Sequence, residues 1–218
     1  MKQSKLLTVL LATLIALVLL TGSIAVPILF RPFYYAHIIP LELCEQSGLT
    51  ESEIKTAYGE MLDFCLGAEK FSTGILRWSE EGKNHFADVR ALFLLDLWGL
   101  GISSALLCTT FIAARRTGLR PRLLWGRGPG FWAGAGLGAL FIPIGALAAA
   151  DFDRAFTLFH TFFFPGKDNW LFDPATDEII LILPQVYFMD CAILIFALLV
   201  IGCAALVAAD LLRSRRKG

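Results

Sequence analysis

The stretch of sequence that decides the fold is residues 6–30, LLTVLLATLIALVLLTGSIAVPILF, which contains no charged residue. A helix needs about 20 apolar residues to cross the hydrocarbon core of a bilayer, where no water can bind its backbone groups. Three further stretches reach this length: residues 91–114, which contain one acid, Asp96, the Gly- and Ala-rich residues 131–150, and residues 191–209. Helices of a soluble bundle would show a polar stripe, and these stretches show none. The sequence therefore predicts an integral membrane protein, mainly α-helical, with a bundle of four membrane-spanning helices.

The composition agrees with a single membrane domain over residues 1–218. Hydrophobic residues make up 56% of the chain and charged residues only 17%, whereas about a quarter of the residues of a soluble domain are charged. The sequence contains no internal repeat and no low-complexity tract. We therefore expect the functional residues to lie in the two long connections, residues 31–88 and 151–186, because long loops commonly carry binding and catalytic groups.

The distribution of charge predicts the orientation in the membrane. The short segments 1–5, 115–130 and 213–218 together hold eleven Lys and Arg residues and no acid. The long connections 31–88 and 151–186 hold seven bases and sixteen acids. Because basic loops tend to stay in the cytoplasm, we expect both termini there and both long loops on the outer face.

The first apolar stretch shares some features with a cleaved signal peptide. Lys2 and Lys5 precede it, and residues 22–25 supply small side chains. The stretch is much longer than the 7–15 apolar residues of a signal peptide, however. We therefore interpret it as a span that stays in the protein.

The two outer loops are expected to form a small cap, either all helical or with short strands. Residues 50–53, TESE, form a capping box and are followed by apolar residues at helical spacing. This pattern predicts an amphipathic helix that either lies on the membrane surface or packs on the rest of its loop. A second helix is expected to begin near Glu81 and to run into the span 91–114. The apolar run Ile179–Pro184 is interpreted as either a strand or a segment that dips into the membrane.

The cysteines allow two interpretations. Cys44 and Cys65 lie in the first outer loop, where an exported location permits a disulfide between them. Free buried thiols are an equal alternative, because nothing in the sequence fixes the distance between the two residues. Cys108, Cys191 and Cys203 lie within or beside spans and are interpreted as packing residues.

All three histidines fall on the predicted outer side. His37, His85 and His160 could surround one site, or their placement could be chance. His85 and Asp88 share a helical face at i and i+3, and a carboxylate beside an imidazole can fix its tautomer. Asp96 lies inside a span, where an acid normally faces a polar interior or a base, or else locks helix packing.

Aromatic residues surround His160. The run from Phe159 to Phe164 is followed by Asn169, Trp170 and Phe172. Aromatic residues are common at bilayer interfaces, so the cluster is either an interfacial belt or a lipid-lined mouth with His160 and Asn169 as its polar groups.

Several chemistries lack their sequence signatures. The chain contains no His-Glu-x-x-His motif, no G-x-S-x-G motif and no Walker loop. The three histidines do not have the spacing of a metal site. No basic, aromatic-interleaved outer face indicates nucleic acid. We expect no metal, no cofactor and no nucleic-acid partner.

Three short segments carry a resemblance to a known family. Asn84–Val89 (NHFADV), Phe159–Phe163 (FHTFF) and Trp170–Phe172 (WLF) resemble segments of Lit, the lipoprotein intramolecular transacylase family of bacterial inner-membrane proteins. Further residues that match are Pro174, Leu183, Pro184, Phe188 and Asp190. The four-span layout extends the resemblance over the full length, whereas residues 31–83 contribute little to it.

The resemblance implies an acyltransferase of the bacterial cytoplasmic membrane with its active site on the extracytoplasmic face. Its partners would be membrane lipids and a lipoprotein whose N-terminal cysteine carries a diacylglyceryl group. The sn-2 acyl chain would move from its ester to the α-amine of the same cysteine and give the lyso-form lipoprotein. Both reactants belong to one substrate, so no nucleophile from the enzyme is required.

The resemblance points to His85 and His160 as catalytic residues. One imidazole can take a proton from an attacking amine and return it to a departing alkoxide. We expect His85 to do so, oriented by Asp88 or a backbone carbonyl, and His160, with Asn169, to stabilise the oxyanion or position the ester. Residues with a possible orienting or substrate-binding function are Asp88, Asp96, Asn169, Trp170 and His37.

Two other functions remain open. A non-enzymatic membrane accessory or scaffold subunit would use the small residues 133–138 as a helix-packing face. A four-span thiol oxidoreductase similar to DsbB would carry a cysteine pair in each outer loop, but residues 151–186 contain no cysteine. Replacing both His85 and His160 separates the first alternative from a transacylase, because a scaffold would keep its function.

Overall fold

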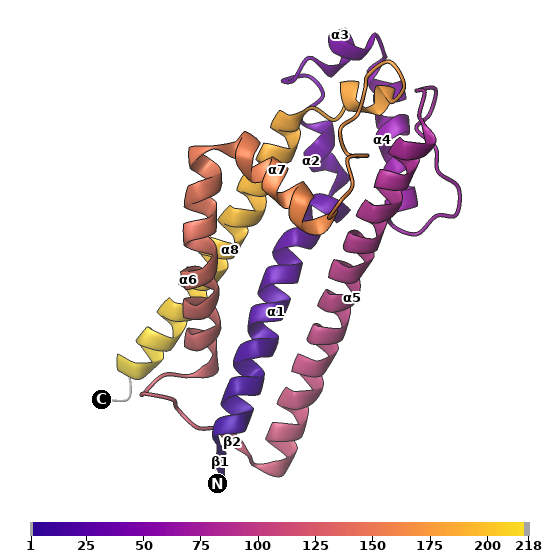
Figure 1. Cartoon of the computed structure of the whole chain (residues 1–218). Coiled ribbons are helices and arrows are strands. Elements are labelled where there is room, and N and C mark those ends of the chain that lie inside the picture. Colours follow the sequence, from indigo (N-terminus) through magenta and orange to yellow (C-terminus); the bar gives the residue numbers. More distant parts are fainter. Residues whose placement is uncertain (1, 216–218) are drawn as a thin grey trace. The chain divides into compact units, whose positions relative to one another are not determined.

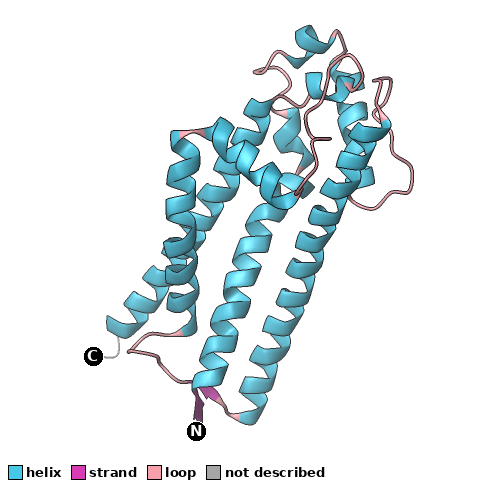
Figure 2. Ribbon diagram, viewed as in Figure 1, coloured by secondary structure: helices cyan, strands magenta, loops and turns pink. Residues whose placement is uncertain are grey.

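The structure is a computed structural model that describes residues 2–215, and it is almost entirely helical (Figures 1 and 2). The helices are α1 (Lys5–Leu29), α2 (Arg31–Tyr35), α3 (Leu43–Ser47), α4 (Glu51–Cys65), α5 (Glu80–Thr117), α6 (Pro129–Ala150), α7 (Phe152–Phe163), the 3₁₀ helix η1 (Glu178–Leu181) and α8 (Gln185–Arg215). Two short strands, β1 (Gln3–Ser4) and β2 (Arg120–Pro121), pair in parallel. Four of the helices, α1, α5, α6 and α8, are long and apolar enough to cross a membrane. This confirms the four predicted spans.

The chain divides into two compact units. The first comprises residues up to Ala25, Asp96–Ala149 and residues from Leu194 onward. The second comprises Val26–Leu95 and Ala150–Ile193.

Small residues allow the helices of the first unit to approach one another closely. A Cβ atom at Gly134 of α6 would lie 2.7 Å from the carbonyl oxygen of Cys203 in α8, and Gly202 of α8 has no room for a side chain beside Leu19 of α1. Outward-facing residues such as Trp98 and Leu147 are mostly exposed. An apolar outer surface of this kind is what lipid chains cover.

The first unit also contains the basic connection between α5 and α6. The Thr8 hydroxyl donates to the carbonyl of Arg122 at 2.6 Å, beside the β1–β2 pair. The Asp210 carboxylate accepts from the backbone N–H of Gly128 at 2.9 Å and lies 3.7 Å from the Arg127 guanidinium. These contacts hold the basic connection against the ends of α1 and α8. Asp96, the acid in the span of α5, has one buried carboxylate oxygen without a hydrogen-bond partner among residues 2–215.

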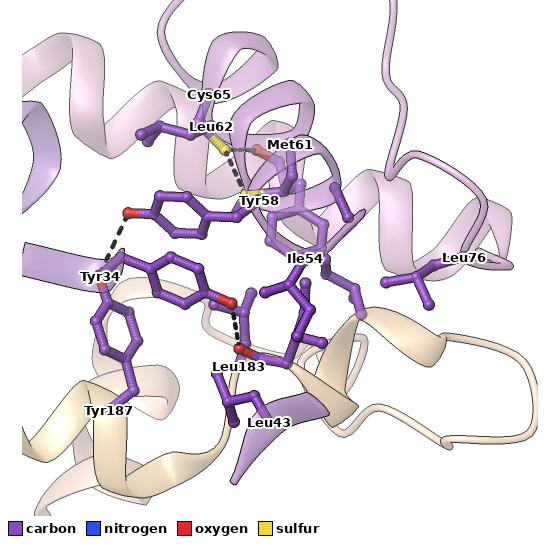
Figure 3. Packing of buried hydrophobic residues seen from close by; sticks show 14 of the residues in the cluster. Tyr34, Leu43, Ile54, Tyr58, Met61, Leu62, Cys65, Leu76, Leu183 and Tyr187 are labelled. Carbon is purple, nitrogen blue, oxygen red and sulfur yellow. Dashed lines mark hydrogen bonds between the residues drawn. The ribbon is translucent and has the colours of Figure 1, made fainter. Parts of the chain in front are cut away.

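The second unit has its own hydrophobic core, built around three tyrosines (Figure 3). The rings of Tyr34 and Tyr58 stack with centroids 3.6 Å apart, and Tyr187 packs edge-on against Tyr34. The Tyr34 hydroxyl donates to the carbonyl of Ile182 at 2.8 Å, and the hydroxyls of Tyr58 and Tyr187 lie 3.3 Å apart. The buried hydroxyls therefore have partners, as polar groups in a core require.

Helix α4 begins as the sequence predicts. The Thr50 side chain accepts from the backbone N–H of Glu53, whose carboxylate accepts from the backbone N–H of Thr50 at 2.8 Å. Its apolar face, including Ile54 and Leu62, is buried in the core of the second unit. Of the two arrangements considered for this helix, the structure therefore has the one in which the helix packs on the rest of its unit.

The run Ile179–Pro184 is neither a strand nor a segment exposed to lipid. It forms η1 and the following turn, and Ile179, Ile182 and Leu183 are buried in the core of the second unit. The unit contains no strand in the part of the chain that the structure describes. Cys44 and Cys65 are both free thiols.

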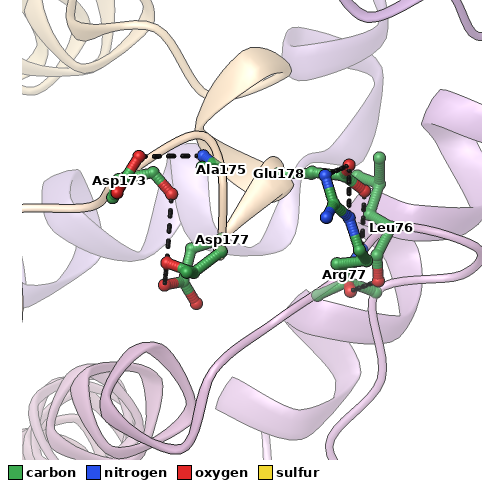
Figure 4. Close-up of polar contacts among 8 residues, drawn as sticks. Leu76, Arg77, Asp173, Ala175, Asp177 and Glu178 are labelled. Carbon is green, nitrogen blue, oxygen red and sulfur yellow. Dashed lines mark hydrogen bonds and ion pairs between the residues drawn. The ribbon is translucent and has the colours of Figure 1, made fainter.

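A polar connection joins the loop after α4 to the segment before η1 (Figure 4). The buried Asp177 carboxylate accepts from the backbone N–H of Ser79 at 2.8 Å and from the Ser79 hydroxyl at 2.8 Å. Next to it, Glu178 accepts from the backbone N–H of Arg77 at 2.8 Å and from its guanidinium at 2.7 Å. These bonds fix the chain at the point where α5 begins.

Candidate active site

Two of the three histidines meet within the second unit. His85 lies near the start of α5, before the apolar residues 91–114, and His160 lies on α7. Only 5% of His85 and 8% of His160 is exposed. Their ring centroids are 5.9 Å apart and their planes differ by 29°. The site therefore brings together residues from both long connections, 31–88 and 151–186.

The sequence of α7 explains why His160 points inward. The Asp151 side chain accepts from the backbone N–H of Arg154 at 2.9 Å and caps the helix. Phe162 and Phe163 are exposed while His160 is buried, so the helix presents an aromatic surface on one side and the imidazole on the other. An amphipathic helix of this kind suits a membrane interface.

Aromatic rings form the walls of the site. His85 makes edge contacts with Phe164 at 5.1 Å and with Phe172 at 5.4 Å between centroids. His160 stacks on Trp170 at 4.5 Å and also contacts Phe156 at 4.2 Å. These rings exclude water from both imidazoles.

The hydrogen bonds of the two imidazoles differ. His160 Nδ1 lies 2.8 Å from the carbonyl oxygen of Phe156. A carbonyl can only accept, so Nδ1 carries the proton and Nε2 of the neutral ring has a free lone pair. In contrast, His85 Nδ1 and Asn169 Oδ1 are buried and make no hydrogen bond of ordinary geometry within residues 2–215. A weaker hydrogen-bonding interaction with Asn169 still raises the pKa of His85, so these two side chains interact with each other.

Burial favours the neutral form of both histidines. The pKa of His85 is lowered to about 4, first by burial and next by the neighbouring His160; Asp88 acts in the opposite direction. Burial also lowers the pKa of His160, and the hydrogen bond with Phe156 partly opposes this. Both imidazoles are therefore neutral at pH 7 and able to accept a proton.

Asp88 has a partner other than the expected one. Its carboxylate accepts from Lys167 Nζ at 2.6 and 2.7 Å, and no hydrogen bond joins it to His85. No sequence pattern marks Lys167, which follows a turn at Gly166 with a φ of 72°. Only the folded chain shows that this lysine lies next to the site.

The remaining candidates are distributed as follows. Asn169 and Trp170 belong to the site, whereas His37 belongs to a separate cluster. His37 Nε2 lies 3.2 Å from the Asp190 carboxylate, and Nδ1 lies 2.7 Å from the carbonyl of Phe33. Asp96 lies in the first unit. Within residues 2–215, no group of three or more His, Cys, Asp or Glu side chains is placed to hold a metal ion.

Two cavities of different character adjoin the histidine pair. One, of about 260 Å³, is lined by Ala91, Leu92, Phe163, Phe164 and Pro165, with Asp88 and Lys167 also in its wall. The other, of about 270 Å³, is lined by carboxylates together with Asn169 and Phe172. Its acidic residues are Glu80, Glu81, Asp173 and Asp177. His85 contacts Phe164 of the first cavity and Phe172 of the second, so it lies between the two.

Comparisons with known proteins show the family and the fold of the chain. The family model for the lipoprotein intramolecular transacylase Lit matches residues 9–188. The chain is similar to the structure of the membrane integral lipoprotein intramolecular transacylase Lit from Bacillus cereus, with 22% identity, a TM-score of 0.82, and coverage of 98% of this chain and 97% of that chain.

Two variants of the Bacillus cereus protein also match. A variant in which a histidine is replaced by arginine has a TM-score of 0.76 at 22% identity, with 98% of this chain and 94% of that chain covered. A variant in which a histidine is replaced by alanine has a TM-score of 0.74 at 23% identity, with 97% and 94% covered. At this identity the structural likeness concerns the fold. No curated protein sequence matches the chain.

Proposed function

Because the chain belongs to the lipoprotein intramolecular transacylase family and is therefore a membrane acyltransferase, we propose that it transfers the sn-2 acyl chain of a diacylglyceryl-modified lipoprotein to that lipoprotein's own N-terminal amine. The product is the N-acyl, lyso-form lipoprotein. The observation that carries this proposal is the pair of buried, neutral imidazoles enclosed by aromatic rings. The family assignment leaves the scaffold and thiol oxidoreductase alternatives without support.

The reaction exchanges one bond for another within a single substrate. The cysteine amine attacks the ester carbonyl carbon, a C–N bond forms, and the C–O bond to the glyceryl oxygen breaks. The amine loses one proton and the glyceryl oxygen gains one. Because amine and ester are parts of one molecule, holding them together supplies much of the rate acceleration.

The hydrogen bonds of the two imidazoles support a division of functions opposite to the one expected from the sequence. His160 has its proton on Nδ1, where it donates to Phe156, so Nε2 is the atom that can take the proton of the amine and deliver it to the glyceryl oxygen. A neutral His160 in this tautomer cannot donate to an oxyanion from Nε2. His85 has no such restraint and can donate a hydrogen bond to the oxyanion.

We place the site at the extracytoplasmic surface of a bacterial cytoplasmic membrane. The acidic outer loops and the basic termini support this orientation. The exposed aromatic residues of α7 support a position at the level of the lipid headgroups. At this depth both the peptide and the acyl chains of a lipoprotein can reach the histidines.

The proposal is tested by mass spectrometry of the N-terminal lipopeptide of a reporter lipoprotein. The host should leave diacylglyceryl-cysteine unacylated at its amine, and the gene is supplied as wild type, His85→Gln, His85→Ala or His160→Gln. Glutamine can donate a hydrogen bond but cannot act as a base. We expect N-acylation at unchanged total acyl mass in the wild type, a loss of 10²- to 10⁴-fold in His160→Gln, and more activity in His85→Gln than in His85→Ala.

The matched control is Thr161→Ala, a change at an exposed neighbour of His160 on α7, which should remain active. A diacylated reporter with a free amine in the presence of well-expressed wild-type protein would disprove the transfer. Equal activity of His160→Gln and wild type would exclude His160 as the base.

A further inference from the structure

We propose that the basic connection between α5 and α6 binds the headgroups of anionic phospholipids. The binding surface consists of exposed bases and apolar side chains around the β1–β2 pair and the turn that follows it: Lys2, Arg120, Arg122, Leu123 and Trp125. Its occupant is the phosphate group of an anionic lipid in the leaflet that this connection faces. The inference concerns the first unit and does not depend on acyl transfer.

Backbone contacts hold the bases of this surface together. The strands β1 and β2 lie side by side in parallel (Figure 1), and the backbone N–H of Arg120 donates to the carbonyl of Lys2 at 3.0 Å. The Thr8 hydroxyl of α1 holds the carbonyl of Arg122. Lys2, Arg120 and Arg122 are exposed, and no carboxylate within residues 2–215 forms an ion pair with them. Their positive charges therefore attract an anion from outside the chain.

Trp125 has an unusual position in the turn after β2. The backbone N–H groups of Leu124 and Arg127 each donate to the carbonyl of the other residue at 2.9 Å and close a tight turn. The central residues, Trp125 and Gly126, have φ values of 47° and 76°. Turns of this kind favour Asn, Asp or Gly at the first central position, because a bulky residue is strained at positive φ. Trp125 is also 87% exposed, so its own burial does not offset the strain.

The surroundings of Trp125 direct it toward the bilayer surface. Trp132 of α6 donates from Nε1 to the carbonyl of Leu124 at 3.2 Å, and its ring meets that of Trp125 edge-on at 5.3 Å. The connection has only residues 118–128 between two helices that can cross a membrane, so it stays close to the membrane surface. At this depth tryptophan side chains insert among the lipid headgroups. A lipid contact thus explains a tryptophan that is both strained and exposed.

The charge of the surface selects among lipids. The guanidinium groups of Arg120 and Arg122 match the geometry of a phosphate and can donate two hydrogen bonds to it. The headgroup of a zwitterionic lipid carries an ammonium group as well, which the same bases repel, whereas an anionic headgroup carries none to offset its phosphate. Clusters of bases next to a membrane-spanning helix are typical of proteins that bind anionic lipids of the cytoplasmic leaflet.

The experiment compares two lipids that differ only in the headgroup. Purified full-length protein in detergent is titrated with phosphatidylglycerol or with phosphatidylcholine of the same acyl chains. Native mass spectrometry measures lipid binding, and thermal unfolding is followed with and without lipid. The variants are the double substitution Arg120→Gln with Arg122→Gln, and Trp125→Asn. The control, Lys70→Gln with Arg154→Gln, removes two exposed bases of the second unit.

We expect the wild type and the control to bind phosphatidylglycerol about tenfold more tightly than phosphatidylcholine, and the double variant to lose this preference. Trp125→Asn should also bind phosphatidylglycerol more weakly. Without lipid, however, it should unfold at the same temperature as the wild type or at a higher one, because Asn suits this turn.

Three results would overturn the proposal. The first is equal affinity of the wild type for the two lipids. The second is a double variant that keeps the preference, or a control that loses it to the same extent. The third is a lower unfolding temperature of Trp125→Asn without lipid, because the contact with Trp132 would then account for the tryptophan.

Discussion

At the residue scale, the two histidines are alike in burial but not in how their nitrogen atoms are bound. His160 has its tautomer fixed by the carbonyl of Phe156, whereas His85 Nδ1 is left without a partner among the described residues. A buried polar atom without a partner is costly unless a ligand supplies one. Asn169 interacts with His85, and a substrate group that bonds to either side chain would complete the hydrogen bonds of this pair.

The burial of both histidines predicts an unusual pH dependence. The base must be neutral, so protonation of His160 abolishes transfer, and the lowered pKa means that this happens below the ordinary value of about 6.5. The attacking α-amine must also be neutral, and its pKa is about 8. We expect log(kcat/KM) to rise with a slope of one from about pH 6.5 to 7, because only the amine titrates there, and the slope to approach two only at lower pH, where His160 titrates. Measurement on a soluble-chain lipopeptide substrate over pH 4.5–9 checks this.

A second group that titrates in the same pH interval would contradict the lowered pKa values of the two histidines. If the histidines had ordinary pKa values, the slope would approach two below about pH 6.5. The variant His85→Gln provides the control: it removes one of the two imidazoles that can titrate but leaves the amine unchanged. Its profile should keep the slope of one above pH 6.5, where only the substrate amine titrates.

At the scale of the elements, local signals were sufficient for some helices and insufficient for others. Helix α4 could be predicted because its capping box and apolar face are encoded within residues 50–65. The run Ile179–Leu183 could not, because a short apolar run fits a strand as well as a buried helical turn. Contacts with Tyr34 and the rest of the core, far away in sequence, decide its conformation.

In the candidate site, too, some residues could be selected from local sequence signals and others depend on contacts between distant parts of the chain. His85 and His160 could be selected from their position on the outer side and from the family resemblance. Lys167 could not, because its partner Asp88 is 79 residues away in the sequence. The pairing of Asp88 with His85 was expected from helical spacing, but a nearby ammonium group attracts a carboxylate more strongly than a neutral imidazole does.

The polar connection at Asp177 makes a prediction about stability. Asp177 is 5% exposed, and Asp177→Ala would leave the backbone N–H of Ser79 and its hydroxyl without their acceptor. We expect the free energy of unfolding to fall by about 1–3 kcal/mol. The comparison is Arg77→Ala, which breaks an ion pair with Glu178 at the surface and should have a smaller effect, because exposed ion pairs contribute little to stability. Denaturant unfolding of the purified protein in detergent measures both.

Equal effects of the two substitutions would contradict this ranking. Asp177→Asn is a useful third variant, because an amide oxygen can still accept from Ser79. It should be less destabilised than Asp177→Ala. If Asp177→Asn and Asp177→Ala unfold at the same denaturant concentration, the hydrogen bonds to Ser79 do not stabilise the start of α5.

At the scale of the whole molecule, the four spans were predictable because their signal is long and local. Each span is a continuous apolar stretch, and the bilayer permits few alternatives to a helix. The start of α5 at Glu80 agrees with the expected start near Glu81, whereas α8 begins at Gln185, several residues before the apolar stretch 191–209. The first turn of α8 is held by contacts within the second unit, such as that of Tyr187 with Tyr34. Those contacts are between residues of separate elements, which no local pattern encodes.

The orientation of the chain gives the last prediction, and the chemistry depends on it. A protease site inserted between Glu69 and Lys70, an exposed turn after α4, should be cut by protease added to intact spheroplasts. A site between Gly118 and Leu119, in the basic connection after α5, should be cut only after the membrane is opened. The reason is the charge asymmetry, since the cytoplasmic side retains Lys- and Arg-rich loops. Transfer of an acyl chain to an exported lipoprotein requires both histidines on the outer side. Cleavage after Gly118 in intact spheroplasts would place them in the cytoplasm, and an exported substrate could then not reach the site.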